Sequence, residues 1–529
     1  MIRPQLDDPE IAAGMAAIAA FMSSRDGGGF TRCETTGATP AVSRWRAAAL
    51  ADGVSAGRGR QQKPGAWNCW KAALSLLLLA LLYNASFSSV LAAGDSAEES
   101  DDTSVQQSVG DATLIASNSP VTTEQAQPPA PVLIKVALAL GNRSVQIDAP
   151  DGATVASLKT GDAVAVLPPH SRWAVSSSST ETIAFSGRGD HDFAKLASDG
   201  GGFRVKHVAY LPTAAPPLHN SFSLPPQFSA AFARNTAGYI VVPNGATVNE
   251  QLVACNGKLY RGAIWLRPAP DTVSAINIVD LEDYLLSVLP SEMPSTWPAG
   301  ALQAQAIAAR SYAIANLGKH GKDGYDLKAT TEDQVYSGVT SEHQTSNDAV
   351  AATNGLVLKH QGKPISAFFH STSGGCTELA ENVWSRPLPY LKSVVDYDDN
   401  SPHFSWTRKV GCDDLEKAYG KDVGQVLAMI VVSRTATNRV KDLLVVGTHN
   451  TTLVSGNGIR LALKLPSSNF NIGYEENSYT FAGRGFGHGL GMSQYGARAL
   501  AEQGYNAAQI LAYYYRDVSV DYIAGTPGI

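Results

Sequence analysis

Cysteine and charge are both scarce in this sequence. Five cysteines in 529 residues are too few for a scaffold held together by disulfides. Charged residues make up 17% of the chain, the net charge is −6, and the lysines and arginines form no long run. A basic surface for nucleic acid is therefore excluded, and nucleic acid is not an expected partner. Cys255, Cys376 and Cys412 predict either one disulfide and a leftover thiol or small buried thiols, and their spacing does not decide between them.

The chain also lacks an apolar run as long as the about 20 residues that a spanning helix prefers. Its most apolar run, residues 72–82 (AALSLLLLALL), is shorter than that. Basic residues precede it, acidic sequence follows it, and small residues lie near Ala92, so we interpret residues 72–93 as a signal peptide. The alternative is a signal anchor. Either one predicts export to the periplasm or cell envelope, with this segment as the only contact with a membrane. Residues 1–71 are an N-terminal extension to which we assign no function.

Changes in composition divide the rest of the chain. Residues 94–131 are rich in Ser, Thr, Gln, Asp and Glu, which predicts a flexible polar linker. Short alternating runs broken by Gly, Pro and Asn predict a small β-rich module over residues 132–212. Residues 235–522 combine clustered strands with helices but show no regular βαβ alternation. They predict an α+β fold with a β-rich core and several helices.

Local patterns give the expected elements of this larger region. Strands are expected at residues 239–243, 252–255, 263–267, 356–359, 365–369, 429–433, 440–446 and 459–463. Helices are expected from a cap at Asp280 to Pro290, from near Pro298 to Gly318, and at residues 348–353, 493–501 and 506–515, the last of them capped by Asn506.

One carboxylate is held between two prolines. Glu292 lies in the segment Pro290–Pro294, where both prolines restrict the backbone before and after it. A carboxyl group with so little freedom is pre-positioned for proton transfer. The alternative is a solvated side chain in a turn, the usual environment of a glutamate.

Several motifs around Glu292 occur in an order that resembles the SpoIID/LytB family. The first is Glu292-Met293-Pro294, followed by the helix motif from Gln305 to Ala313. Three more follow along the chain: Gln334-Val335-Tyr336-Ser337-Gly338; His370 to Gly375 with Trp384 after it; and the glycine-rich segment from Gly485 to Ala497. The resemblance covers roughly residues 235 to 520.

The resemblance implies an exported enzyme that cleaves the glycan strands of bacterial peptidoglycan as a lytic transglycosylase. Glu292 would act as acid and then as base, and no cofactor is implied. The other polar and glycine residues of the motifs would bind the glycan or shape its groove: Gln303, Arg310, Gln334, Tyr336, His370, Ser371, Ser373, Gly485, Gly487, His488, Ser493 and Gln494. Arg310 would hold either substrate or a neighbouring loop. The runner-up is a non-catalytic wall-binding protein that stimulates a cell-wall amidase, and a purely structural envelope protein ranks last.

Other chemistries fit these motifs poorly. The glycine-rich segment lacks the Gly-Lys-[Ser/Thr] ending and the spacing of nucleotide loops, and its glycines serve either ligand approach or structure alone. The run from His370 to Gly375 lacks the Gly-x-Ser-x-Gly elbow of serine hydrolases. His370, His488 and Cys376 are too irregularly spaced to indicate zinc. Some family members bind zinc through two cysteines before the Gln-x-Tyr motif, but residues 327–333 (LKATTED) contain none, so no metal is expected.

Overall fold

A computed structural model describes residues 132–177, 180, 183–187, 194–195, 203–205, 224–232, 236–245, 251–384, 386–475 and 478–523. The expected extension at 1–71, the export segment at 72–93 and the linker at 94–131 lie outside these residues. Within them, no helix is long and apolar enough to cross a membrane. The mixed α+β class is confirmed.

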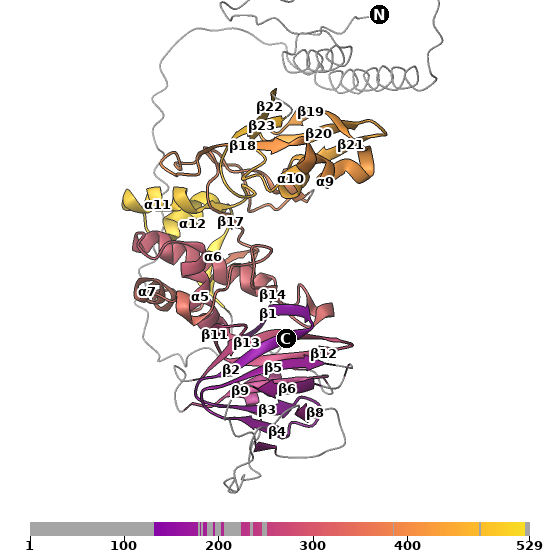
Figure 1. Ribbon diagram of the computed structural model, residues 1–529. Coiled ribbons are helices and arrows are strands. Elements are labelled where there is room, and N and C mark those ends of the chain that lie inside the picture. Colours follow the sequence, from indigo (N-terminus) through magenta and orange to yellow (C-terminus); the bar gives the residue numbers. More distant parts are fainter. Residues whose placement is uncertain are drawn as a thin grey trace, which may run out of the picture.

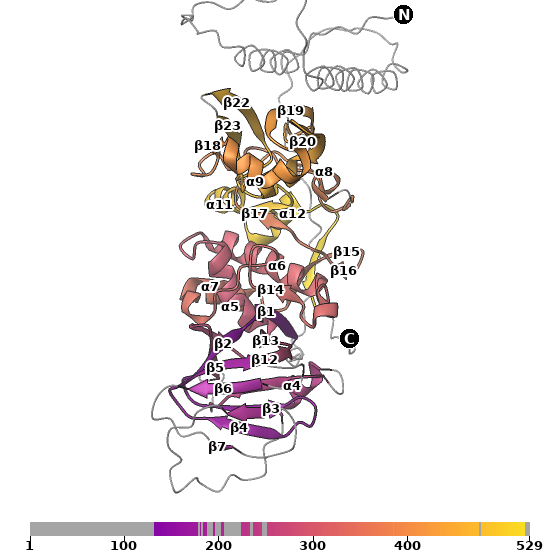
Figure 2. The same cartoon turned by 45° about the vertical axis from the view of Figure 1, so that its right-hand side comes forward.

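Two β-sheets form one end of the molecule (Figures 1 and 2). The first has the order β14 (Leu327–Lys328), β1 (Leu133–Asn142), β13 (Thr272–Asp280), β12 (Ala263–Ala269), β9 (Tyr239–Pro243), β3 (Ala153–Ser157), β4 (Ala163–Leu167) and β7 (Ala194–Lys195). The second has the order β11 (Lys258–Arg261), β10 (Leu252–Cys255), β2 (Ser144–Ala149), β5 (Ser171–Ser177), β6 (Ile183–Gly187) and β8 (Phe203–Val205). Alternate residues of strands from both sheets meet in one apolar core, which contains Ile134, Val136, Ile147 and Val175.

These sheets mix strands from the two regions that the composition separates. β1 pairs with β13 and β3 pairs with β9, so strands of residues 132–212 and of residues 239–280 belong to the same sheets. The strands described within residues 132–212 therefore do not form a separate module. Composition did not reveal this, because hydrogen-bond pairing between distant strands leaves no local signal.

A layer of helices covers the sheets and forms the middle of the molecule (Figure 1). Its members are α5 (Leu281–Glu292), α6 (Ala299–Ala315), α7 (Gln344–Ala352), α11 (Gln494–Glu502) and α12 (Ala507–Tyr514). α6 contacts all four of the others and is buried along most of its length, which its many alanines permit because they let neighbouring helices approach closely. Short elements complete the layer: η1 (Gly321–Asp323), η2 (Val339–Ser341), β15 (Leu356–His360), β16 (Lys363–Pro364), β17 (Phe369–His370), α8 (Ala380–Trp384), β24 (Met492–Ser493) and β25 (Ser519–Tyr522). The short helix α4 (Pro226–Ala230) packs instead on the first sheet, where Phe228 contacts an apolar cluster that includes Ile240 and Trp265.

Residues 405–484 form an outer domain at the end opposite the two sheets (Figures 1 and 2). It contains β18 (Ser405–Gly411), α9 (Cys412–Val423), β19 (Val426–Arg434), β20 (Val440–Gly447), β21 (Thr451–Ser455), α10 (Gly456–Ala462), β22 (Phe470–Glu475) and β23 (Ser478–Arg484). Its apolar side chains, among them Leu415, Leu443 and Phe481, form a core of their own. The outer domain interrupts the helical layer, since β17 and β24 pair with each other across it.

Three local expectations differ from the structure. Residues 459–463 lie in and just after helix α10 rather than in a strand; Ser455 caps this helix, and Ile459 and Leu463 are buried together at helical spacing. Residues 365–369 are mostly irregular, with strand only at Phe369–His370. Pro290 does not end α5, which runs on to Glu292, because a proline in the last turn removes a single helical hydrogen bond.

The three cysteines in the described part of the chain are free thiols. Cys255 is buried between the sheets, and burial raises the pKa of its thiol to about 12. The alternative of a disulfide among Cys255, Cys376 and Cys412 is therefore wrong for this structure.

Candidate functional site

Helix α5 carries Glu292 as its last residue. The carboxylate of Asp280 caps the helix by accepting the N–H of Glu282 at 2.9 Å, as the sequence predicts. Leu281, Tyr284, Leu285 and Val288 form the buried apolar stripe that fixes the helix on the sheets. After Glu292, Met293 is extended, the conformation favoured before a proline, and its N–H donates to the carbonyl of Leu289 at 2.9 Å. The rigid setting predicted for this carboxylate is thus a helix end rather than a proline turn.

The carboxyl group of Glu292 is half-buried and makes one hydrogen bond. The N–H of Val335 donates to its Oε1 at 2.7 Å, while Oε2 has no hydrogen-bond partner among the described residues. Burial raises the pKa of Glu292 to about 7, although the Val335 N–H opposes the shift. The negative end of the α5 dipole disfavours the ionised form as well. Near neutral pH the group can therefore both donate and accept a proton.

The loop that supplies the Val335 N–H is fixed at both ends. On one side Asp333 is buried and accepts hydrogen bonds from Lys319, from the N–H of Lys328 at 2.8 Å and from the hydroxyl of Tyr312 at 3.0 Å. Burial raises the pKa of Asp333, but these donors outweigh it and hold the pKa below its usual value. On the other side, Ser287 of α5 accepts the N–H of Gly338 at 2.8 Å. Sequence reasoning missed Asp333, although it stands directly before the Gln-x-Tyr motif.

Gln334 and Tyr336 are buried on either side of Val335 and do not face a groove. Gln334 accepts from the hydroxyl of Tyr284 at 3.2 Å and donates to the carbonyl of Ala309 at 3.2 Å. The hydroxyl of Tyr336 donates to Asn277 at 2.9 Å. The predicted substrate-binding residues here instead tie the loop to α5, α6 and the first sheet.

Arg310 is fully buried and forms a two-pronged ion pair. Its Nε and Nη2 donate to the two carboxylate oxygens of Glu282, each at 2.7 Å, and Nη1 donates to the carbonyl of Leu356 at 3.1 Å. Arg310 therefore ties α6 to helix α5 and to the start of strand β15, and its side chain has no exposed surface for substrate. Gln303 is half-buried on the same helix, whereas Gln305 of the helix motif is completely buried.

The segment from His370 to Gly375 runs beside the start of α11. Ser371 is half-buried, and its carbonyl accepts the N–H of Tyr495 at 3.1 Å. Ser373 is buried, and its hydroxyl donates to Asp398 at 3.0 Å. Asp398 also accepts the N–H groups of Gly374 at 2.9 Å and Gly375 at 3.0 Å, so this carboxylate, which sequence reasoning missed, fixes the turn.

His370 and His488 lie side by side, with ring centroids 5.6 Å apart. His370 is buried, and its Nδ1 hydrogen-bonds to the carbonyl of Leu490 at 3.0 Å. Nδ1 of His488 accepts the N–H of Leu490 at 3.0 Å. Burial lowers the pKa of both rings, to about 3 for His488, so both are neutral at physiological pH.

The glycines of the glycine-rich segment are needed for contacts within the protein. Gly485 and Gly487 both have positive φ, at +82° and +118°. A Cβ on Gly485 would lie 2.7 Å from the carbonyl oxygen of Ser373, and one on Gly487 would lie 2.7 Å from Cβ of His370. The structural explanation of these glycines therefore accounts for them without a ligand.

The residues that follow the glycines contact the candidate acid directly. Ser493 is buried and caps α11 by accepting the N–H of Gly496 at 3.2 Å. The next residue, Gln494, donates from Nε2 to the backbone carbonyl of Glu292 at 3.0 Å. Among the predicted binding residues, Gln494 is thus the one that the structure brings into contact with Glu292.

The described residues contain no group of three His, Cys, Asp or Glu side chains arranged to hold an ion. The segment before the Gln-x-Tyr motif supplies no thiol, and the oxygens of Asp333 are occupied by protein donors.

Two family models match the chain. The family described as "Stage II sporulation protein" matches residues 270–360, which include Glu292, Arg310 and Val335. A second family, described as a domain of unknown function (DUF8618), matches residues 391–491, which include the outer domain.

Individual proteins named for stage II sporulation, and an amidase enhancer, are also similar to this chain. Stage II sporulation protein D of Bacillus amyloliquefaciens is 34% identical over 263 residues, which cover 46% of this chain and 75% of that protein. Stage II sporulation protein D of Bacillus subtilis is 31% identical over 301 residues, covering 52% of this chain and 87% of that protein. The amidase enhancer of Bacillus subtilis is 31% identical over 285 residues, covering 44% of this chain and 39% of that protein.

Proposed function

Because the chain belongs to the SpoIID/LytB family, that of stage II sporulation protein D, we propose that it remodels bacterial peptidoglycan as a lytic transglycosylase. The substrate would be the glycan strand, cut between N-acetylmuramic acid and N-acetylglucosamine. The proposal rests on the carboxyl group of Glu292, which is held at a helix end, has one oxygen without a partner among the described residues, and has a pKa of about 7.

The reaction needs one group that gives and then takes a proton. Protonated Glu292 would donate its proton to the glycosidic oxygen as the bond from that oxygen to the anomeric carbon breaks. The 6-hydroxyl oxygen of the muramyl residue would then bond to the anomeric carbon, and its proton would pass to the Glu292 carboxylate. Glu292 is thereby restored to its protonated form, the product carries a 1,6-anhydro ring, and no water is consumed.

The surroundings of Asp333 favour this reaction over hydrolysis. Glycoside hydrolases use two carboxyl groups that flank the bond to be cut. Asp333 is the buried carboxylate of the loop that contacts Glu292, but its side chain is 0% exposed and its oxygens accept from Lys319, Tyr312 and Lys328. It has no room to activate water or to attack a sugar.

The test is analysis of the reaction products. Purified protein would be incubated with glycan strands freed of peptide, and the new chain ends would be identified by mass spectrometry. We expect anhydromuramyl ends, and a rate at least about 100-fold lower for Glu292→Gln. The matched control is Glu332→Gln, which changes an exposed carboxylate in the neighbouring loop and should retain full activity. Full activity of Glu292→Gln would disprove the role of this residue, and new reducing ends would indicate hydrolysis.

A second candidate is stimulation of a cell-wall amidase, which the similarity to the amidase enhancer of Bacillus subtilis favours. In this case the chain would bind the wall and a partner amidase without cutting glycan. Amidase release of stem peptides would rise equally with wild type and Glu292→Gln, and wild type would form no anhydro ends.

Either function requires export. We propose that residues 72–93 direct the chain to the periplasm or cell envelope, because an apolar core with basic residues before it and acidic residues after it is typical of export signals. Fractionation of cells that express the full chain tests this, since recovery with the cytoplasmic proteins would contradict it.

A further inference from the structure

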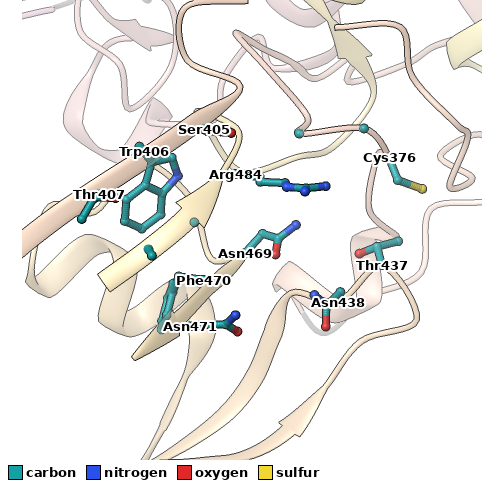
Figure 3. A pocket seen from close by; sticks show the side chains of 14 residues that line it. Cys376, Ser405, Trp406, Thr407, Thr437, Asn438, Asn469, Phe470, Asn471 and Arg484 are labelled. Carbon is teal, nitrogen blue, oxygen red and sulfur yellow. The ribbon is translucent and has the colours of Figure 1, made fainter. Parts of the chain in front are cut away.

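A cavity of about 830 Å³ lies between the outer domain and the segment Gly374–Cys376 (Figure 3). This volume lies within the range of sites for small organic ligands. Its lining residues are Gly374, Gly375, Cys376, Ser405, Trp406, Thr407, Thr437, Asn438, Asn469, Phe470, Asn471, Ala482, Gly483 and Arg484. Three of these side chains carry amides and three carry hydroxyls, Arg484 is the charged side chain of the set, and none of the fourteen is a carboxylate.

The walls of the cavity are fixed by contacts from behind. The guanidinium of Arg434 donates to the backbone carbonyls of Asn438 at 3.0 Å and Phe470 at 3.1 Å, and to the side-chain oxygen of Asn471 at 2.9 Å. At the other end, Nε1 of Trp406 donates to Ser467 at 3.3 Å. A Cβ on Gly483 would lie 2.4 Å from the Trp406 ring, so a glycine is needed where the indole crosses strand β23. The site is built before any ligand arrives.

Two lining side chains are available to a ligand. The side-chain amide of Asn469 makes no hydrogen bond, and Arg484 makes no ion pair, with any residue that the structure describes. Figure 3 shows the Arg484 side chain extending across the cavity between Trp406 at one end and Cys376 at the other. Its guanidinium lies over the ring of Phe404, 5.6 Å from the centroid, which holds it in place without neutralising it.

A row of rings connects this cavity with the neighbourhood of Glu292. Trp297 and Tyr495 have centroids 4.8 Å apart, Tyr495 and His403 6.2 Å, and His403 and Phe486 5.0 Å. Tyr495 directly follows Gln494, which contacts Glu292, whereas Phe486 is two residues from Arg484. All four rings are half-buried or exposed, so their faces and edges are open to the apolar faces of sugar rings.

The protein backbone makes the same connection. The carbonyl of Ser371 accepts from Tyr495, and Gly374, which lines the cavity, follows three residues later, a span of at most roughly 11 Å. The segment that contacts the start of α11 thus continues directly into the wall of the cavity.

We propose that the cavity is a saccharide-binding subsite that holds N-acetylated hexose units of the strand that Glu292 cuts. This inference rests on the proposed function. The side-chain amide of Asn469 can both donate and accept, which suits hydroxyl and acetamide groups, and the planar guanidinium of Arg484 can donate to two neighbouring hydroxyls. The absence of a lining carboxylate disfavours ligands that carry free amines.

The test measures binding separately from cleavage. A tetramer of N-acetylglucosamine would be titrated into protein that carries Glu292→Gln, with and without the pair Asn469→Ala and Arg484→Ala. We expect the pair to weaken binding about tenfold, the loss of two or so modest hydrogen bonds. The matched control is Lys409→Ala, which removes an exposed cation from strand β18 outside the cavity and should leave affinity unchanged. Hydrogen exchange should show protection of residues 405–407 and 469–471 by the tetramer.

Equal affinity of the paired variant and the control would overturn the proposal, as would protection by a soluble stem peptide and not by the sugar. A different result would show that the proposed cleavage is wrong while the binding site is right. The protein would form no anhydromuramyl ends, but the tetramer would still bind the cavity and protect its residues from hydrogen exchange.

Discussion

At the scale of single residues, the raised pKa of Glu292 has a consequence for stability. Its ordinary value is 4.5 and its value in the fold is about 7, so the folded chain holds the proton more tightly than the unfolded chain. The carboxyl group therefore destabilises the fold increasingly as pH rises from about 4.5 to 7, and fully above that. Glutamine imitates the neutral form at every pH.

We accordingly expect Glu292→Gln to raise the free energy of unfolding at pH 8 by on the order of 1–2 kcal/mol, allowing for partial exposure, and to leave it nearly unchanged at pH 4.5. Urea denaturation at the two pH values measures this difference. An equal effect at both would mean that the carboxyl group is not shifted in the fold. Cleavage of glycan should decline as pH rises through about 7, because the proton donor is lost.

Asp398 is a second residue whose charge stabilises the fold. It accepts from the hydroxyl of Ser373 and from the backbone N–H groups of Ser373, Gly374 and Gly375. Asp398→Asn removes the charge and should cost roughly 2 kcal/mol or more of stability, because several hydrogen bonds to a buried carboxylate weaken together. Thermal unfolding of Asp398→Asn against Asp399→Asn, an exposed neighbour, measures the cost. Similar melting temperatures for the two variants would contradict it.

At the scale of elements, the buried ion pair between Arg310 and Glu282 joins α5 to α6. Arg310 is 0% exposed, so Glu282→Gln would leave a buried cation without its partner. We expect a loss of about 3 kcal/mol in unfolding free energy. The comparison is Glu502→Gln, which breaks the pair with Arg498 on the surface of α11 and should cost at most about 1 kcal/mol. Chemical denaturation distinguishes the two, and equal effects would refute the structural role of Arg310.

Elements with local signals could be predicted from the sequence. The caps at Asp280 and Asn506 and the strands at residues 239–243 and 252–255 are confirmed, because capping and alternation depend on near neighbours. The strand predicted at residues 459–463 is wrong, because a short apolar run fits either a strand or one turn of a helix, and here it belongs to α10 and its C-cap.

The candidate site could be predicted only where it depends on residues that are near neighbours in the sequence. The restricted backbone around Glu292 follows from its own segment, although that segment is a helix end and not a proline turn. The burial of Arg310, Gln334 and Tyr336 depends on partners 25 or more residues away, such as Glu282, Tyr284 and Asn277, and no pattern within their motifs indicates it.

At the scale of the whole molecule, the outer domain and the two sheets have separate cores. The apolar cluster of the outer domain lies between Trp406 and Phe481 in sequence and includes no residue of the sheets. Its link to the rest depends on polar contacts. Arg439 donates to the carbonyls of Ser373 at 2.7 Å and Cys376 at 3.1 Å, and Thr435 donates to Glu378 at 2.6 Å.

Units with separate cores open separately when few contacts join them. We expect hydrogen exchange in moderate denaturant to show one opening free energy for residues 410–481 and another for the sheet strands of residues 133–149. Arg439→Met should lower the first by about 3 kcal/mol, since it leaves Glu378 without a buried counter-charge, and leave the second unchanged. Lys441→Met, which removes an exposed cation nearby, is the control and should change neither. If Arg439→Met lowered both free energies equally, the two units would form one cooperative fold, and the outer domain could not adjust its position over a glycan strand independently of the sheets.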